Sequence, residues 1–505
     1  MTSFLLRGAR LVDVDGTRRS AEPVDVRVAD GMVAAVGAHL PATGVPEVAA
    51  DGRWLSPGLW DQHVHLGQWS LTSARLDLAP VRSAEQAVAL VQERLAEWPD
   101  LPVIGWGHRP SGWPQQPVVS MLDALDTDQP VILIAGDGHH AWLNSRALMA
   151  LHLPSREGVV AEAEWFSAYG RLSSVLGDDG TGPDAYRRAM EQAAQLGVVG
   201  LTDFEFSGGH TEWAERWAAG ADLLRIRMAT YADGLDAVIA AGLRTSDRLP
   251  GCDDRARMGP LKIISDGSLN TATAWCCEPY AGPSPYGFPH GQPNQSPEEL
   301  RDLLRRGTAH GLQVAVHAIG DRAVGEALDA FAETGARGSI EHAQLVRRDD
   351  VRRMAELGVT ASVQPAHLLD DRDVTERLWP GQAGRSFALR WMLDDGVHLA
   401  MGSDAPVSPL DPWLAMAAAV HRSADDREAW HPEQAITPRE ALAASTDGWG
   451  TVAVGHPADL ILLDADPLAS EEEPATAASR RRGVNVAVTW VAGNAVHDSS
   501  GCASL

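Results

Sequence analysis

The chain has 505 residues, of which 45% are hydrophobic and 22% charged, an ordinary globular composition with room for one large domain and a smaller one. Its 68 acidic residues outnumber its 42 Lys and Arg residues and give a formal net charge of −26. Such a surface repels phosphate backbones and anionic membranes, so we expect no nucleic-acid or membrane partner.

The amino-terminal segment has only a three-residue apolar run before Arg7, which is too short for a signal peptide. No apolar stretch approaches the ~20 residues of a membrane span. Four cysteines are too few for a disulfide framework in a chain of this length. We therefore expect a cytoplasmic protein, and a homodimer is a candidate assembly.

Residues 1–57 are predicted to form short strands separated by turns. Asp30-Gly31 lies between alternating apolar positions and indicates a hairpin. Residues 447–505 have the same character, since "ADLILLDADP" and "VNVAVTWVAGNAVHD" are short, rich in β-branched residues and punctuated by Gly. The two ends of the chain are therefore both β-rich.

Residues 58–446 alternate strand-like runs with helical stretches such as "SPEELRDLLRRGTAHG", which predicts βα units, a parallel sheet and an α/β fold. The opening run "LWDQHVH" is followed by seven others, at 197–204, 223–231, 260–267, 312–321, 337–344, 358–365 and 396–406. Eight strands close a (β/α)8 TIM barrel. The stretch from about 67 to 180, rich in Trp, Pro and Gly, is predicted to be an insertion on the βα face.

His63 and His65 stand two residues apart at the end of the first predicted strand. Residues i and i+2 of a strand face the same side, so the two imidazoles are suited to binding one metal ion. Alone, the pair is a weak signal because it also arises by chance. Active sites of such barrels lie at the C-terminal strand ends, which here carry Lys262 on the fourth strand, His317 on the fifth, His342 on the sixth and Asp404 on the eighth.

This set resembles the amidohydrolase superfamily, whose pattern is His-x-His, Lys, His, His and Asp on strands one, four, five, six and eight. Finer features of the chain resemble the YtcJ-like branch of this superfamily. They are "LKIISDGSL", "VHAIGDRAV", "IEHAQ", "GSDAPVSPLDPW", "DGHHAWLNSRAL" and "GHPADLILLDADP". The resemblance covers nearly the whole chain. It implies that segments 1–57 and 447–505 form a β-sandwich domain flanking the barrel. His139 matches a histidine of the branch and is a candidate for substrate contact, with a structural role as the alternative.

Neutral imidazole and carboxylate suit zinc, and manganese or another divalent ion is an alternative. Zinc lowers the pKa of bound water from ~15.7 to about 7. A protonated lysine cannot ligate a metal. In the superfamily the lysine amine reacts with CO2 to form a carbamate, which can bind metal. On Lys262 such a carbamate would bridge two ions. The alternative is a lysine salt-bridged to Asp266, four residues on, beside a single metal ion.

The resemblance further implies that Asp404 binds one metal and acts as general base, while His317 and His342 hold the second metal. The rival for these two histidines is a hydrogen-bonded position in the core. We predict a metal-dependent hydrolase that cleaves a C–N bond of an amide-like substrate (N-acyl, N-formyl or cyclic amide). One alternative is an ester, carbamate or lactone hydrolase with the same centre. Another is a non-enzymatic assembly protein, although such relatives lose ligands and this chain retains all six.

The insertion carries candidates for contact with the small-molecule substrate, which we expect to have an apolar or aromatic part. Loops at the C-terminal face of a barrel build its pocket, and flat aromatic rings stack well on apolar ligands. The alternative is that these rings only pack the insertion onto the barrel. The candidate residues are Trp106, Trp113 and Trp142.

Overall fold

The computed structural model describes residues 3–17, 22–42, 44–73, 75–78, 80–108, 110, 113–135, 140–169, 171–172, 182–206, 208–282, 287–424, 427–469, 478–479 and 482–503. The chain forms two compact units. Unit 1 comprises Met1–Leu66 and Arg187–Leu505, and unit 2 comprises Gly67–Tyr186. Each unit has its own sheet and hydrophobic clusters, so each is described by itself.

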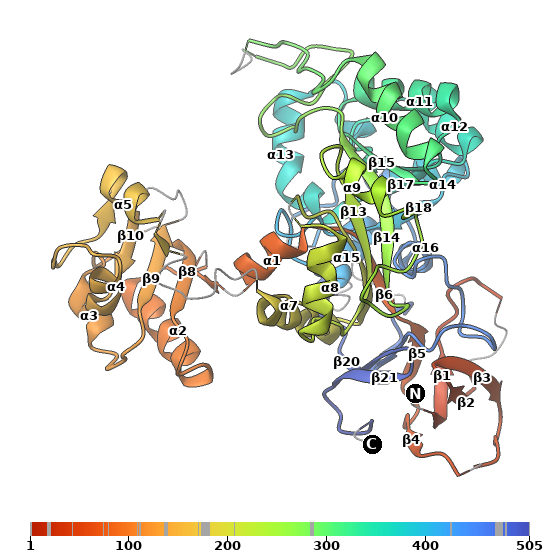
Figure 1. Ribbon diagram of the computed structural model, residues 1–505, viewed down its shortest axis with the longest axis horizontal. Helices are drawn as coiled ribbons and strands as arrows, with labels where there is room; N and C mark the ends of the chain where they lie inside the picture. The colour runs from red at the N-terminus through yellow and green to blue at the C-terminus, as the bar shows by residue number, and fades with distance from the viewer. Residues whose placement is uncertain are drawn as a thin grey trace. The chain divides into compact units, whose positions relative to one another are not determined.

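The centre of unit 1 is a parallel sheet whose strands follow one another in chain order (Figure 1). A parallel bridge between Val64 and Ala405 joins its two edges, so the barrel is nearly closed. Each run predicted for the barrel overlaps an observed strand, which confirms the predicted α/β class and barrel. Among the described residues the eight strands are β6 (Leu59–Val64), β12 (Val198–Asp203), β13 (Arg225–Thr230), β14 (Ala256–Ile264), β15 (Val314–Ala318), β16 (Gly338–His342), β17 (Thr360–Val363) and β18 (Leu399–Met401).

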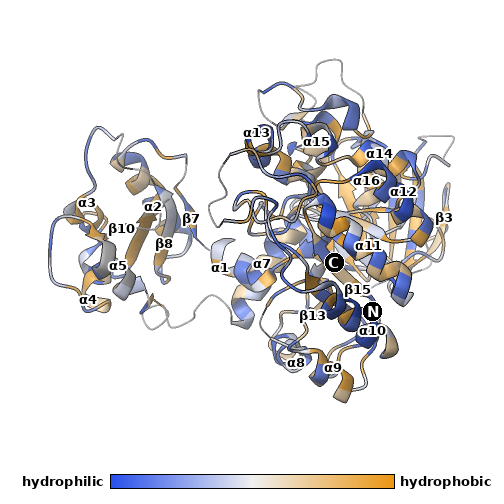
Figure 2. Ribbon diagram, turned by 90° about the horizontal axis from the view of Figure 1, so that it is seen from above, coloured by the Kyte–Doolittle hydropathy of each residue, from blue (hydrophilic) through white to orange (hydrophobic). Residues whose placement is uncertain are grey.

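Helices follow the strands, and in Figure 2 those such as α10 and α12 carry many hydrophilic residues. Ser296 caps α10 through a reciprocal capping box with Glu299, and α11 ends at Gly335, which has the left-handed φ of 66° typical of a helix end. The helices of unit 1 are α7 (Pro183–Gln195, which begins in unit 2), α8 (His210–Ala218), α9 (Leu235–Ala240), α10 (Pro297–Ala309), α11 (Asp321–Thr334), α12 (Arg348–Leu357), α13 (Leu368–Leu378), α14 (Leu389–Asp394), α15 (Pro412–His421) and α16 (Pro438–Ala444).

The two ends of the chain join in a second sheet of unit 1. Strand β5 lies at its middle, pairing with β1 in parallel and with β19 antiparallel. Within the described ranges this sheet contains β1 (Phe4–Leu11), β2 (Val24–Ala29), β3 (Met32–Gly37), β4 (Glu47–Ala49), β5 (Trp54–Pro57), β19 (Leu460–Leu463), β20 (Val486–Val491) and β21 (Asn494–Asp498).

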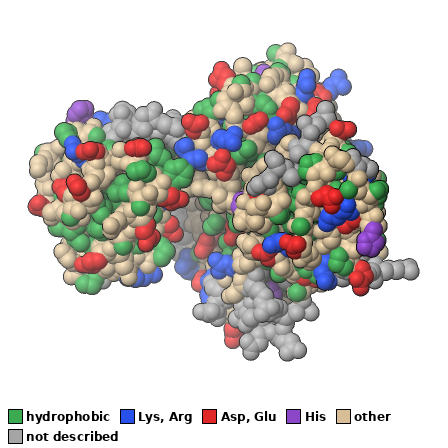
Figure 3. Space-filling view, turned by 90° about the horizontal axis from the view of Figure 1, so that it is seen from below, with side chains coloured by type: hydrophobic (Ala, Val, Ile, Leu, Met, Phe, Trp, Pro, Cys, Tyr) green, Lys and Arg blue, Asp and Glu red, His purple; other side chains and the backbone are tan. Residues whose placement is uncertain are grey.

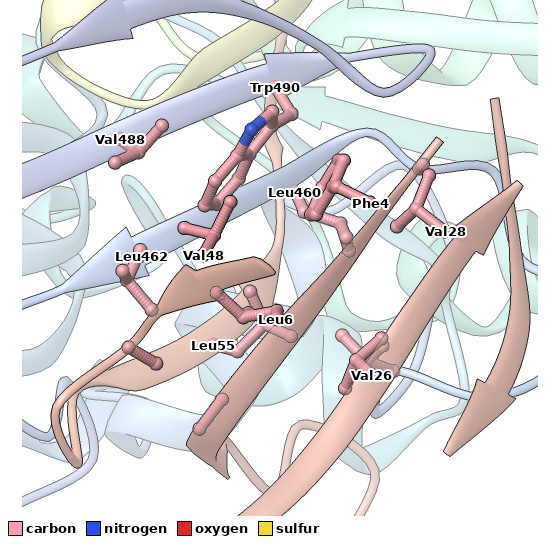
Figure 4. Close-up of a cluster of buried hydrophobic side chains, with 14 of the residues drawn as sticks. Phe4, Leu6, Val26, Val28, Val48, Leu55, Leu460, Leu462, Val488 and Trp490 are labelled. Atoms are coloured by element: carbon pink, nitrogen blue, oxygen red, sulfur yellow. The ribbon is translucent and has the colours of Figure 1, made fainter. Parts of the chain in front are cut away.

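The core of this sheet draws on both chain ends (Figure 4). Phe4 of β1 stacks on Trp490 of β20, with ring centroids 5.5 Å apart. The predicted hairpin is confirmed, because β2 and β3 pair antiparallel and Asp30 and Gly31 between them both have positive φ. The division of this sheet into two packed layers, as in a sandwich, stays a prediction.

Unit 2 is a small α/β unit that covers nearly the same residues as the predicted insertion. Its sheet runs in the order β11-β10-β9-β8-β7 and packs a core that includes Leu78, Val91 and Leu133. Its described elements are α1 (Leu66–Ser73), β7 (Leu76–Asp77), α2 (Ala84–Glu97), β8 (Val103–His108), α3 (Val119–Asp123), β9 (Val131–Ala135), β10 (His140–Leu143), α4 (Ser145–Ala150), β11 (Val160–Ala161) and α5 (Glu162–Tyr169).

The surface carries charges of both signs. On the face in Figure 3, acidic and basic side chains are interspersed. Over the described part of the chain, every helix is too short or too polar to cross a bilayer.

Candidate metal centre

The first and last barrel strands meet at a seam, and hydrogen bonds across this seam hold His63 and His65 beside Asp404. The amide of Asp404 donates to the carbonyl of His63 at 2.7 Å, and the amide of His65 donates to the carbonyl of Ala405 at 2.9 Å. Below them, buried Asp61 accepts hydrogen bonds from the amides of His63 and Ser403 at 3.0 and 2.9 Å. Backbone bonds therefore bring residues more than 300 positions apart to one point.

His63, His342 and Asp404 form a buried group whose possible ligand atoms all lie within 4.8 Å of one another. His65 joins them, with Nε2 at 3.3 Å from Asp404 Oδ1. Its Nδ1 is buried and has no hydrogen-bond partner among the described residues. The backbones of His342 and Asp404 have positive φ, 72° and 57°. Such strained conformations persist where surrounding structure enforces them, typically at functional sites.

The protonation states of this group suit a divalent cation. Burial holds the pKa values of His63 and His342 well below the usual value, so both imidazoles are neutral at neutral pH. Burial opposes ionisation of Asp404, but the surrounding imidazoles, His63 first and then His65, outweigh it and hold its pKa well below the usual value. Neutral imidazole with ionised carboxylate is a donor set that fits zinc and similar ions.

Lys262 lies inside this group, as the sequence predicted for the fourth strand. Its Nζ is 3.3 Å from His63 Nε2 and 4.2 Å from the ring centroid of Phe204. Burial lowers the pKa of Lys262 to about 8, although Glu341 and Asp404 act in the opposite direction. The neutral amine is therefore more populated at neutral pH than it would be at the ordinary pKa of a lysine.

His317 lies at the edge of the group. Its ring centroid is 4.5 Å from that of His342, and its Nε2 is 3.3 Å from the carbonyl oxygen of Gly267. Burial lowers its pKa to about 4. Asp266, the alternative partner for Lys262, instead accepts hydrogen bonds from the amides of Trp275, Ile319 and Gly320. No ion pair joins Asp266 to Lys262 among the residues that the structure describes.

Glu341 contributes to the centre and was missed from the sequence. Its Oε2 lies 2.6 Å from Nδ1 of His63, and both side chains are 1% exposed. A carboxylate on Nδ1 fixes the tautomer of an imidazole and turns Nε2 toward the metal. The signal was present in "IEHAQ", where Glu341 directly precedes His342.

Two further residues at the same barrel mouth were also missed. His367 ends the short helix η2 (Pro365–His367) after β17, and its Nε2 is 3.8 Å from Asp404 Oδ2. Phe206 is 53% exposed and stacks on His65 with ring centroids 4.9 Å apart. The strand-end rule could have found His367, because it follows the seventh strand.

The aromatic candidates of the insertion belong to unit 2. Trp113 and Trp142 are part of its core, and Trp142 Nε1 donates to the carbonyl of Val118 at 2.8 Å. Trp106 is 36% exposed. His139 lies outside the described residues. A substrate contact by any of these four residues stays a prediction.

A cavity of about 920 Å³ opens at the opposite end of the barrel from the candidate centre. It is lined by residues at the N-terminal ends of strands, among them Gly338 and Thr360, and reaches inward to Glu341. Barrel active sites lie at the C-terminal face, so the mouth of this cavity lies at the opposite end of the barrel from the centre described above, and Glu341 borders both.

A family model described as the Amidohydrolase family matches residues 47–497 of the chain. Protein LONG AFTER FAR-RED 3 of Arabidopsis thaliana is 29% identical over 482 residues, covering 84% of this chain and 80% of that protein. Putative amidohydrolase YtcJ of Bacillus subtilis is 26% identical, with 88% and 91% covered.

N-substituted formamide deformylase of Arthrobacter pascens is 25% identical to this chain, with 93% of this chain and 94% of that protein covered. Among solved structures, an uncharacterized metal-dependent hydrolase of Pyrococcus horikoshii superposes with a TM-score of 0.72 and 25% identity. That match covers 93% of this chain and 99% of the other.

Proposed function

Because this chain belongs to the Amidohydrolase family, we propose that it is a metal-dependent hydrolase that cleaves a non-peptide C–N bond of an amide-like substrate. The observation that carries the proposal is the meeting of neutral imidazoles, an ionised carboxylate and a buried lysine at the C-terminal mouth of the barrel. This donor set fits one or two divalent ions, zinc or manganese.

His63, His65, His317, His342 and Asp404 would hold the metal. A bound divalent ion lowers the pKa of water toward 7 and polarises a carbonyl oxygen. Glu341 orients His63 through the bond to Nδ1. The described residues thus supply both the metal-binding atoms and a hydrogen bond that orients one of the imidazoles.

Asp404 is the proposed proton carrier. Its carboxylate is ionised and buried, and it faces the site from the seam of the barrel. It would accept a proton from the attacking water and deliver it to the amine nitrogen as the C–N bond breaks.

Lys262 is proposed to carry a carbamate, formed when its neutral amine adds to CO2 and loses a proton. The lowered pKa supports this, since only the unprotonated amine reacts. The carbamate would replace a cation that repels metal ions with an anion whose two oxygens can bind them.

N-substituted formamides are the first substrate class to test. The similarity to the N-substituted formamide deformylase of Arthrobacter pascens supports this choice. Exposed Phe206, which stacks on the candidate ligand His65, supports a substrate with an apolar or aromatic part.

The test is a hydrolysis panel with purified protein supplied with zinc or manganese. It compares N-alkyl and N-arylalkyl formamides, N-acyl amines and cyclic amides with esters, carbamates and lactones, and it measures release of amine or acid. We expect turnover of at least one amide class, and none after chelation. Faster turnover of an ester or lactone than of every amide would contradict the proposal, as would full activity after exhaustive metal removal.

A further inference from the structure

His367 is the one histidine at the barrel mouth, among the described residues, that the proposed centre does not use. Its side chain is 11% exposed, and its Nε2 is buried without a hydrogen-bond partner in the described part of the chain. A buried nitrogen left unpaired costs free energy, so an unsatisfied group in a folded protein calls for an explanation.

The unpaired nitrogen faces the proposed reaction centre. Nε2 lies 3.8 Å from Asp404 Oδ2, which is too long for a hydrogen bond. The imidazole lies beside His342 with nearly parallel rings, 22° apart at a centroid distance of 6.2 Å. His367 therefore borders the same space as the metal ligands, although it is not one of the three residues whose possible ligand atoms all lie within 4.8 Å of one another.

A polar network from two other barrel loops lies one helical turn from His367. His367 has helical φ and ψ of −59° and −30° at the start of α13, so Asp371, four residues on, lies on the same helix face. Asp371 accepts hydrogen bonds from Asn270 Nδ2 and Gln344 Nε2, both at 2.9 Å. These amides follow the fourth and sixth barrel strands, so three loops meet at Asp371, one helical turn from His367.

We propose that His367 is a substrate-binding residue that donates a hydrogen bond from Nε2 to the carbonyl oxygen of the scissile amide. The inference rests on the proposed function for the identity of that carbonyl. An imidazole N–H at this position adds a donor beside the metal ligands, where negative charge develops on the oxygen as water attacks. It also gives the buried nitrogen the partner that it lacks.

The experiment uses His367→Ala and His367→Gln in the full chain, loaded with zinc. We expect zinc affinity, measured by competition with a chromophoric chelator, to stay within about threefold of the unaltered protein. We expect kcat/KM for the best formamide of the panel to fall about tenfold to hundredfold in His367→Ala. His367→Gln should recover part of the loss because its amide N–H can still donate.

A binding measurement separates this inference from the proposed function. Acetohydroxamate carries an amide-like carbonyl, and its affinity for the zinc-loaded protein is measured by calorimetry. We expect about tenfold weaker binding to His367→Ala. The matched control is His398→Ala, at the opposite end of the barrel, which should leave zinc affinity, turnover and hydroxamate binding unchanged.

The possible results distinguish a failure of this inference from a failure of the proposed function. If the protein hydrolyses none of the panel but His367→Ala still weakens acetohydroxamate binding, the carbonyl contact stands and the proposed reaction fails. If His367→Ala binds acetohydroxamate as tightly as the unaltered protein does, the inference is overturned. A loss of zinc affinity of tenfold or more in a folded His367→Ala protein would also overturn it, because His367 would then hold the metal.

Discussion

Asp404 lies close to several histidine side chains at the candidate centre. Its oxygens lie 3.5 Å from His63 Nε2, 3.3 Å from His65 Nε2 and 3.8 Å from His367 Nε2. We expect Asp404→Asn to keep the fold and much of the metal while kcat falls by a factor on the order of 10²–10⁴, because an amide cannot accept the proton. Steady-state kinetics with metal analysis tests this, and a near-normal kcat would show that another group handles the proton.

Glu341 offers a separate test through metal affinity. In Glu341→Gln, the amide cannot fix His63 as strongly as the carboxylate 2.6 Å from Nδ1 does. We expect zinc affinity to fall about 10- to 100-fold, with little change in the melting temperature of the metal-free protein. Glu356→Gln is the matched control, since exposed Glu356 lies at the far end of the barrel. Equal zinc affinities for both variants would rule out an orienting role for Glu341.

Lys262 can be tested for the carbamate directly. We expect Lys262→Ala to lose activity and the second metal ion, with partial rescue by short carboxylic acids that replace the carbamate. Lys262→Arg should not respond to these acids, because guanidinium stays charged and cannot form a carbamate. The checks are metal content and rescue kinetics. An unmodified amine in a high-resolution structure of the metal-loaded protein would contradict the carbamate.

At the residue scale, the sequence predicted the groups that the eight-strand pattern places at strand ends. His63, His342 and Asp404 meet as that pattern requires. Glu341 was missed because its role depends on a contact with a residue 278 positions away, which no local pattern encodes. His367 was missed because it lies in a short helical turn beyond the end of the seventh strand, where the strand period no longer indicates the direction of a side chain.

At the element scale, the seam between β6 and β18 leaves no room for an added side chain. A Cβ on Gly402 would lie 2.6 Å from the amide nitrogen of His63 and 2.9 Å from Asp61 Oδ1. We expect Gly402→Ala to lower the free energy of unfolding by about 1–3 kcal/mol and to weaken metal binding, because the seam positions His63. Denaturant unfolding measures the loss.

The control for this variant is Gly381→Ala, where a Cβ would have no neighbour within 4 Å among the described atoms and φ is not positive. We expect its stability to be close to that of the unaltered protein. If Gly402→Ala were equally stable and bound metal normally, the seam would be more adaptable than the backbone contacts indicate.

The boundaries of elements were harder to predict than their existence. The sequence placed the fourth strand at 260–267, beginning at Pro260. Instead β14 begins at Ala256, and the pairing register with β13 shifts between Met258 and Leu261, so Pro260 lies at an irregularity in the ladder. The residue at which such a strand begins depends on its pairing with the neighbouring strand, and the sequence alone does not reveal that pairing.

At the scale of the whole molecule, the described metal candidates all belong to unit 1, whereas unit 2 has a core of its own. Ligand binding stabilises the structure that holds the ligand. We expect removal of metal to speed amide hydrogen exchange in β6, β16 and β18 and to leave β8 and β9 unchanged. Exchange measured by mass spectrometry checks this, and an equal rise in β8 and β9 would show that unit 2 also responds to the metal.

The pairing of β5 with β19 has a consequence for biosynthesis. Arg53, just before β5, binds Asp464, just after β19 and 411 residues later in the chain. At 5–20 residues per second, a ribosome needs roughly 20–80 s to make that intervening stretch. During this time β5, which leads directly into the strand carrying His63, has an unpaired edge. We expect the nascent chain to need protection from aggregation, and metal to enter only after synthesis has passed β19.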